Sequence, residues 1–143
     1  MYMCTSIALK TKNFLFGRNL DLHYPFGSCV VTPNGYAFPF EKSSTKTTPR
    51  YALIGTAQTL DGYPLYAEAA NEKGLAIAGL NFPKNAYYAK RENKKKIGVP
   101  PYALIPFILR QCADIRQAAT LLKTVEIINE PFRHDSALHL VLL

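Results

Sequence analysis

The sequence predicts an α+β fold in which helices pack against an antiparallel sheet. Short stretches rich in β-branched and aromatic residues, separated by turn residues, fill roughly its first half. Apolar residues at helical spacing follow between Tyr102 and Val125, and a last apolar run extends from Ala137 to Leu143. Strands that come first, followed by two helices and one more strand, indicate a layered α+β arrangement.

The first two predicted strands form a hairpin. Residues Thr5 to Leu9 alternate and are rich in β-formers, and Phe14 to Phe16 follow after the polar turn Lys10 to Asn13. Turn residues also separate the later stretches, and Pro33-Asn34-Gly35 is the strongest of these signals. The further predicted strands are Cys29 to Thr32, Tyr36 to Phe40, Tyr51 to Thr56, Leu65 to Ala70 and Leu75 to Leu80.

Two helices are predicted in the second half of the sequence. Tyr102 to Cys112 has apolar residues at helical spacing, with Pro106 either in its first turn or at a kink. Asp114 is a good N-cap residue for the second helix, Ile115 to Val125. The run Ala137 to Leu143 predicts a buried final strand.

Length and composition describe an ordinary globular domain. The 143 residues fit one domain, with 48% hydrophobic and 19% charged residues. No apolar run is long enough to cross a bilayer, and the first residues show no secretory signal. We therefore expect a cytoplasmic location and no membrane partner.

The net charge of +7 has an ordinary explanation. Much of it lies in the run Lys90 to Lys96, which we interpret as a solvated loop. No aromatic residues are interleaved with a basic stripe, as single-stranded nucleic acid would require. A nucleic acid partner is therefore not expected.

The three cysteines form no recognisable framework. Their number is odd, and no Cys/Cys or Cys/His spacing is typical of a zinc site. We predict Cys29 and Cys112 as core residues, whereas Cys4 lies almost at the start of the sequence.

Cys4 has two interpretations. If the three residues before it were removed, one residue would hold both a thiol and an α-amino group. The pKa of such an amine is near ~8, so it can accept the thiol proton at working pH. The alternative is a small buried strand residue, which free cysteine often is.

Arg18 and Asp21 follow the second strand of the predicted hairpin, so both can lie near Cys4. Arg18 would favour the thiolate, and Asp21 would hold the amine by a charge-assisted hydrogen bond. The alternative is a surface ion pair of small energetic value.

The segment Asn71 to Pro83 contains two asparagines beside apolar strands. An asparagine at a strand end can present its amide NH₂ group to a developing oxyanion. It can equally be a turn residue that binds its own backbone. The residues alone leave both interpretations open.

Together these motifs resemble the choloylglycine hydrolase family, whose members are bile salt hydrolases and penicillin V acylases. The resemblance runs over nearly the whole chain and keeps the order of the motifs. The matching segments are Met3-Cys4-Thr5, Phe16 to Asp21, Val31 to Pro33, Tyr63 to Tyr66 and Asn71 to Phe82.

The resemblance implies a fold and a cofactor-free reaction. The family fold is the Ntn-hydrolase αββα sandwich, so residues 1–143 would form the N-terminal portion of a single incomplete domain. By this resemblance Cys4 is the nucleophile, its freed amine is the base, and Arg18 and Asp21 organise the thiol and amine. Asn81 would help form the oxyanion hole, and asparagine there is more typical of bile salt hydrolases than of penicillin acylases.

The family resemblance implies three further residues, which would bind the substrate. Leu20, Leu60 and Ala67 occupy positions where the family lines its steroid pocket. Ordinary core packing is the alternative for all three. The substrate implied is a small conjugated bile salt or a related amide.

The sequence departs from the family in two places. Cys4 does not directly follow the initiator methionine, so either translation begins at Met3 or Met1 to Met3 form a short propeptide. Leu138-His139-Leu140 stands where the family usually has Leu-His-Trp, and family members are more than twice as long. We therefore expect a truncated product or a fragment, with little activity alone.

Two alternatives to bile salt hydrolysis stay open at this point. One is penicillin V acylase chemistry with the same nucleophile. The other is a non-catalytic remnant that binds an amphipathic anion. Homo-oligomers are common in the family, and the sequence leaves open whether this chain forms one.

Overall fold

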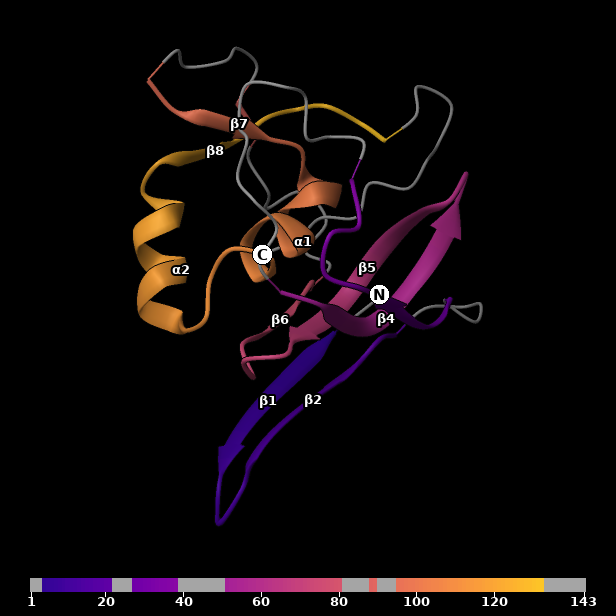
Figure 1. The fold of residues 1–143 in the computed structure, drawn as a ribbon, viewed down its shortest axis with the longest axis vertical. Coiled ribbons are helices and arrows are strands. Elements are labelled where there is room, and N and C mark those ends of the chain that lie inside the picture. The colour runs from indigo at the N-terminus through magenta and orange to yellow at the C-terminus, as the bar shows by residue number, and fades with distance from the viewer. Residues whose placement is uncertain (1–3, 22–26, 39–50, 81–87, 90–94, 133–143) are drawn as a thin grey trace.

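The computed structural model describes residues 4–21, 27–38, 51–80, 88–89 and 95–132 (Figure 1). It is a mixed structure of strands and helices, in agreement with the predicted class. In chain order the elements are β1 (Thr5–Lys10), β2 (Phe14–Asn19), β3 (Ser28–Thr32), β4 (Leu53–Leu60), β5 (Tyr63–Asn71), β6 (Ala76–Ala78), β7 (Ile97–Val99), the 3₁₀ turn η1 (Pro101–Ala103), α1 (Leu104–Leu109), α2 (Ile115–Leu122) and β8 (Val125–Ile127).

The strands of the described residues form three sheets. β1 and β2 make an antiparallel hairpin, and β3, β4, β5 and β6 form a four-stranded antiparallel sheet in that order. β7 and β8 form a short parallel pair. Six predicted strands each overlap an observed one: Thr5 to Leu9, Phe14 to Phe16, Cys29 to Thr32, Tyr51 to Thr56, Leu65 to Ala70 and Leu75 to Leu80. β2, β4 and β5 are longer than the sequence indicated, and β6 is shorter.

The turn between β4 and β5 follows directly from its sequence. Asp61 and Gly62 both have positive φ, 49° and 76°, and Leu60 pairs with Tyr63 across them. Two-residue hairpin loops favour Asp-Gly in this backbone conformation, because its twist matches that of the flanking strands. A register shift between Thr56 and Ala57 leaves Ala67 of β5 without a pairing partner in β4, which marks a β-bulge in β5.

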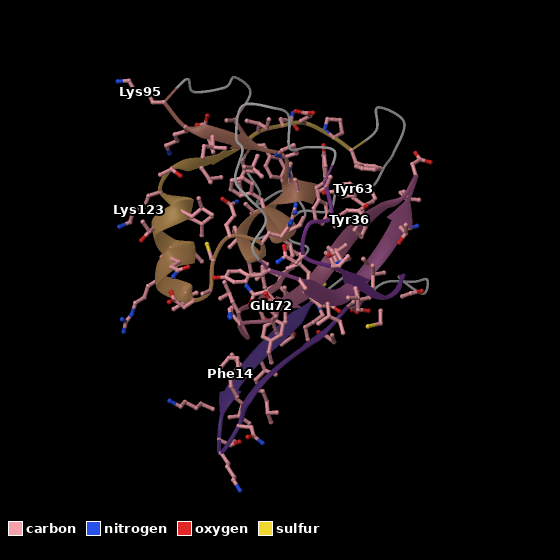
Figure 2. The ribbon with its side chains drawn as sticks, in the orientation of Figure 1. Phe14, Tyr36, Tyr63, Glu72, Lys95 and Lys123 are labelled. Carbon is pink, nitrogen blue, oxygen red and sulfur yellow. The ribbon has the colours of Figure 1, made fainter. Side chains whose placement is uncertain are left out.

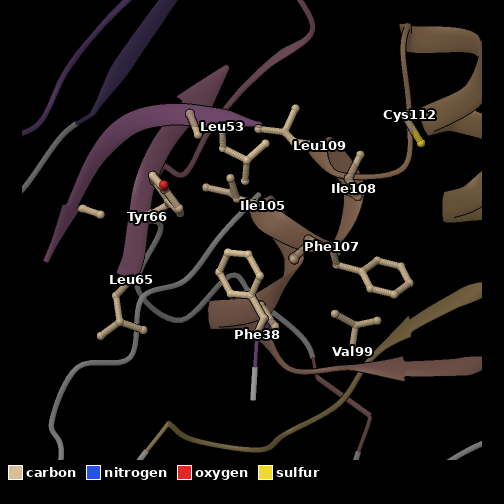
Figure 3. Close-up of a cluster of buried hydrophobic side chains, with 14 of the residues drawn as sticks. Phe38, Leu53, Leu65, Tyr66, Val99, Ile105, Phe107, Ile108, Leu109 and Cys112 are labelled. Atoms are coloured by element: carbon tan, nitrogen blue, oxygen red, sulfur yellow. The ribbon is translucent and has the colours of Figure 1, made fainter. Parts of the chain in front are cut away.

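The main core lies between the four-stranded sheet and α1 (Figure 3). Each of the aliphatic side chains Leu53, Leu65, Ile105 and Leu109 is 2% exposed or less. Tyr66 is also buried, and its hydroxyl lies 2.9 Å from the hydroxyl of Thr32. Burial also raises the pKa of Tyr66, because the charged phenolate would lose its water.

The second helix begins as the sequence predicts, whereas α1 begins at Leu104 and not at Tyr102, after the 3₁₀ turn η1. Pro106 lies in the first turn of α1, where its missing N–H removes no helical hydrogen bond. The carboxylate of Asp114 accepts hydrogen bonds from the backbone N–H groups of Arg116 and Gln117, both at 2.9 Å. Within the described ranges, no helix is both long and apolar enough to span a membrane.

Three sequence predictions about elements are wrong. The first helix was predicted to reach Cys112, but α1 ends at Leu109. Residues Tyr36 to Phe38 form no strand, because the two rings pack edge to face, with centroids 4.9 Å apart, and the Tyr36 hydroxyl donates to the carbonyl of Gly62. The second helix ends at Leu122, and Val125 instead begins β8, where it pairs with Ile97. The predicted strand Ala137 to Leu143 lies outside the described residues.

The β1–β2 hairpin projects from one side of the body, away from α1 and α2 (Figure 1). All six residues of β1 are exposed, and so are Phe14 and Leu15 at the start of β2. Phe14 is labelled on this projecting hairpin in Figure 2. Only the root of the hairpin, near Arg18, is half-buried against the rest of the chain.

Candidate active site

Cys4 lies at the root of the hairpin, directly before β1, and is half-buried. The next residue, Thr5, pairs with Asn19, and its backbone N–H donates to Oδ1 of Asn19 at 2.6 Å. This contact closes the open end of the hairpin. The start of the described chain is therefore held against the end of β2.

Arg18 lies opposite Ser6 in the hairpin register. Because side chains alternate along a strand, continuing the pleat back from Ser6 puts Cys4 on the same face as Arg18. A diagonal neighbour on one face is within reach of a long side chain such as arginine. The predicted approach of Arg18 to the start of the chain is thus consistent with the register.

The guanidinium of Arg18 is buried, with 5% of the side chain exposed. Its Nη2 donates to the backbone carbonyl of Gly79, and its Nε lies 3.3 Å from Oε2 of Glu68. This Nε–Oε2 contact has the distance of an ion pair but not the direction of a hydrogen bond. Nη1 is buried and has no partner among the described residues.

Glu68 supplies the counter-charge that makes the burial of Arg18 tolerable, and sequence reasoning missed it. A buried charge without a partner is strongly destabilising, whereas the pair offsets most of that cost. Glu68 lies opposite Thr56 of β4 and Ala78 of β6, and its side chain is 20% exposed. The sequence signal that could have identified Glu68 is its position as the single acidic residue inside the otherwise apolar run Tyr63 to Ala70.

Asp21 follows β2 by two residues and is exposed. It lies at the same end of the hairpin as Cys4, because Thr5 pairs with Asn19. The structure thus brings Cys4, Arg18 and Asp21 to one end of one hairpin.

The structure describes only one of the two asparagines that the sequence places between Asn71 and Pro83. Asn81 lies outside the described residues, two positions after Gly79. Asn71 is a structural residue, because its buried Nδ2 donates to the carbonyls of Leu109 and Cys112 at 2.8 and 2.7 Å. Its Oδ1 accepts from the backbone N–H groups of Lys73 and Leu75, as the turn interpretation predicts.

The three residues carried over for substrate binding lie on different elements. Leu20 follows β2 and Leu60 ends β4, and both are half-buried. Ala67 is fully buried in β5, and its carbonyl accepts from the N–H of Gly79 at 2.7 Å. Ala67 therefore lies beside the segment that contacts Arg18, and Leu60 lies four pairs along β4 from the partner of Glu68.

The other two cysteines differ from each other. Cys112 is buried, as predicted, and loss of water together with the nearby charge of Asp114 raises the pKa of its thiol. The prediction that Cys29 is a core residue is wrong, because Cys29 is exposed on β3. Among the described residues, no cluster of three or more histidine, cysteine or acidic side chains could hold a metal ion.

Comparison with known proteins identifies a family that matches residues 4–143, described as linear amide C–N hydrolases of the choloylglycine hydrolase family. The bile salt hydrolase/transferase of Clostridium perfringens is 34% identical over 136 residues, which are 93% of this chain and 41% of the relative. The bile salt hydrolase/transferase of Lactiplantibacillus plantarum is 37% identical over 131 residues, 91% of this chain and 40% of the relative.

A solved structure has the same arrangement of elements. It is a crystal structure of a variant of the conjugated bile acid hydrolase of Clostridium perfringens, with a TM-score of 0.82 and 32% identity. The match covers 94% of this chain and 41% of that structure. The chain therefore spans about two-fifths of the length of the proteins it matches.

Proposed function

The chain belongs to the choloylglycine hydrolase family, and on this basis we propose that it cleaves the amide bond of glycine- or taurine-conjugated bile salts. The relatives named above are bile salt and conjugated bile acid hydrolases. We take residues 1–143 as the N-terminal portion of a single domain of the αββα type. Cys4 is the nucleophile of the proposed reaction, and no cofactor takes part.

The observation that supports this proposal most is the charge arrangement at the hairpin root. Cys4 directly precedes Thr5, which pairs with Asn19 beside Arg18, and Glu68 holds the guanidinium of Arg18 from the neighbouring sheet. The pair of Arg18 and Glu68 is thereby fixed beside the start of β1, where the proposed nucleophile lies.

The proposed reaction begins with removal of Met1 to Met3, which frees the α-amino group of Cys4. This amine takes the thiol proton, and the sulfur attacks the carbonyl carbon of the amide. The oxyanion that forms is stabilised by N–H donors, of which the side chain of Asn81 is one. The protonated amine then gives its proton to the leaving glycine or taurine nitrogen, and a thioester remains.

Water completes the reaction. The Cys4 amine accepts a proton from a water molecule, the water oxygen attacks the thioester carbonyl, and the bile acid leaves as the thiol reforms. Asp21 holds the amine in position, and Leu20, Leu60 and Ala67 contact the steroid. From these 143 residues alone we expect slow turnover, because missing oxyanion donors cost about 3–4 kcal/mol each in transition-state stabilisation.

The test is release of glycine from glycocholate and of taurine from taurocholate at high protein concentration. We expect a slow release that is lost in Cys4→Ala and kept in Cys29→Ala, the matched cysteine variant. Penicillin V, assayed in parallel, should be cleaved more slowly than either conjugate. A wild-type rate equal to that of Cys4→Ala would contradict the assignment of Cys4.

A further inference from the structure

Glu68 is a carboxylate inside the four-stranded sheet, where an apolar side chain would ordinarily lie. It belongs to β5, which pairs with β4 along one edge and with β6 along the other, and its chain neighbours Ala67 and Ala69 are 0% and 3% exposed. A buried ion pair can often be replaced as a whole by apolar side chains without loss of stability, although removal of one partner alone is costly. Stability by itself therefore does not explain why a carboxylate and the guanidinium of Arg18 meet here.

Two groups that contact Arg18 lie on one ladder of the sheet. Glu68 pairs with Ala78 across β5 and β6, and its Oε2 lies 3.3 Å from Nε of Arg18. The carbonyl of Gly79 accepts from Nη2 of Arg18, and the N–H of Gly79 donates to the carbonyl of Ala67 at 2.7 Å. One side-chain contact and one backbone contact thus reach the guanidinium from adjacent positions of the β5–β6 ladder.

These two contacts determine the direction of the remaining nitrogen of Arg18. A guanidinium is planar and presents its N–H groups in a fixed fork, so holding Nε and Nη2 also fixes Nη1. Only 5% of the Arg18 side chain is exposed, and no residue in the described ranges accepts a hydrogen bond from the buried Nη1. Buried donors without an acceptor are rare in folded proteins, so Nη1 is positioned for an acceptor from outside those ranges.

The two contacts differ in what they contribute. The carbonyl of Gly79 is a neutral backbone group, whereas Glu68 brings a full negative charge, and contacts between charged groups are the stronger kind. A substitution at position 68 removes this charge and leaves the backbone carbonyl of Gly79 in the chain. Glu68 is therefore the side chain whose loss would release the guanidinium from its fixed direction.

We propose that Glu68 is a positioning residue for the amide hydrolysis, which holds the guanidinium of Arg18 so that Nη1 keeps one direction in the candidate site. Glu68 itself touches neither the substrate nor the reacting atoms, and it acts only through Arg18. The orienting part of this inference rests on the contacts above, and the catalytic part rests on the proposed function. A group whose orientation matters in the transition state alone affects kcat and leaves KM nearly unchanged.

The kinetic test measures glycine release from glycocholate, at a temperature where circular dichroism shows each variant to be folded. Glu68→Gln keeps the size of the side chain and removes its charge, so kcat should fall about ten-fold or more while KM changes less than about two-fold. Glu68→Asp keeps the charge and should recover most of the lost rate. The exposed Glu72, labelled in Figure 2, provides the matched control Glu72→Gln, which should leave both constants unchanged.

A second control separates positioning from stability. Leu109→Ala removes a fully buried side chain of α1, so it destabilises the fold without touching Arg18 or Glu68. Its kcat should stay within about two-fold of the wild type, because the folded molecules keep the fixed guanidinium. A loss of kcat in Leu109→Ala as large as that in Glu68→Gln would overturn the proposal. An unchanged kcat in Glu68→Gln, or no recovery in Glu68→Asp, would overturn it as well.

The direction of Arg18 is measured without substrate. The proton–nitrogen NMR signal of its Nε–H group, assigned by its absence in Arg18→Lys, reports how fast this buried proton exchanges with water. Exchange should be about ten-fold faster or more in Glu68→Gln and unchanged in Glu72→Gln, because a released group opens to water more often. Equal exchange in the wild type and Glu68→Gln would overturn the orienting part.

Failure of the proposed function has a different result. Wild-type turnover equal to that of Cys4→Ala would contradict the proposed function and would overturn the catalytic part of the inference with it. The exchange rate of the Arg18 proton would still decide the orienting part. Active wild type with an equally active Glu68→Gln variant would instead overturn the role of Glu68 and leave the proposed function in place.

Discussion

The core around α1 and the β1–β2 hairpin both contain large apolar side chains, but these side chains have opposite environments. Ile105 and Leu109 of α1 are fully buried, whereas Leu15 of the hairpin is 54% exposed. Both segments would be expected to avoid water on composition alone. The difference shows that the sequence determines which side chains favour burial. Of these two regions, the fold of the 143 residues buries only the side chains of α1.

The two regions meet at the ion pair between Arg18 and Glu68. Arg18 belongs to the hairpin, and Glu68 belongs to β5, whose other residues line the core. Substitutions in the core, at this contact and on the hairpin should therefore have decreasing effects on the stability of the chain. Four such changes follow in that order.

The largest effect is expected for Asn71→Ala. It removes four hydrogen bonds, two of them to the carbonyls of Leu109 and Cys112. Each buried group left without a partner costs about 1–3 kcal/mol, so the free energy of unfolding should fall by about 4 kcal/mol. Urea denaturation followed by circular dichroism measures it, with the exposed Asn129→Ala as control. Equal midpoints for the two variants would contradict this role.

Leu109→Ala tests the core itself. The side chain is fully buried, so its removal leaves a cavity and should cost about 3 kcal/mol of unfolding free energy. The same denaturation experiment measures the loss. A cost below about 1 kcal/mol would mean that the core between α1 and the sheet is loosely packed.

Glu68→Gln tests the contact between the two regions. The buried guanidinium of Arg18 loses its counter-charge, although the 20% exposure of Glu68 allows water to compensate in part. We expect a loss of about 2 kcal/mol, to be measured by the salt dependence of thermal unfolding as well as by urea. The exposed Glu72→Gln is the matched control. A Glu68→Gln variant as stable as this control would show that Arg18 needs no carboxylate.

The smallest effect is expected for Leu15→Ala in the isolated chain. An exposed side chain contributes little to stability, so the change in unfolding free energy should stay below about 0.5 kcal/mol. A large cost in the isolated chain would mean that the hairpin is already packed.

Local signals in the sequence predict much of the fold. The turn at Pro33-Asn34-Gly35 and the N-cap Asp114 act through their nearest neighbours, and the start of α2 follows from such a local rule. The β7–β8 pair could not be predicted in this way. Ile97 and Val125 are distant in sequence, and the pairing forms only because the intervening helices return the chain.

The part of the candidate site that lies on the β1–β2 hairpin was predictable from the sequence, because the register of the hairpin places it. The rest of the site was not predictable. The proximity of Cys4 and Arg18 follows from one tight hairpin. The partner of Arg18 could not be deduced, because Glu68 is 50 residues away and faces the hairpin only through sheet geometry. Cys29 was misplaced for a similar reason, since its sequence resembles a buried strand and its sheet face is uncovered.

The most direct test of the proposed function is the intact mass of the purified Cys29→Ala chain, before and after iodoacetamide. This background removes the exposed thiol, and the buried thiol of Cys112 should react slowly, since its pKa is raised. We predict a chain that begins at Cys4 and gains one label rapidly. A mass that retains Met3, with or without Met1 and Tyr2, would mean that Cys4 has no free amine, and it would contradict the proposed mechanism.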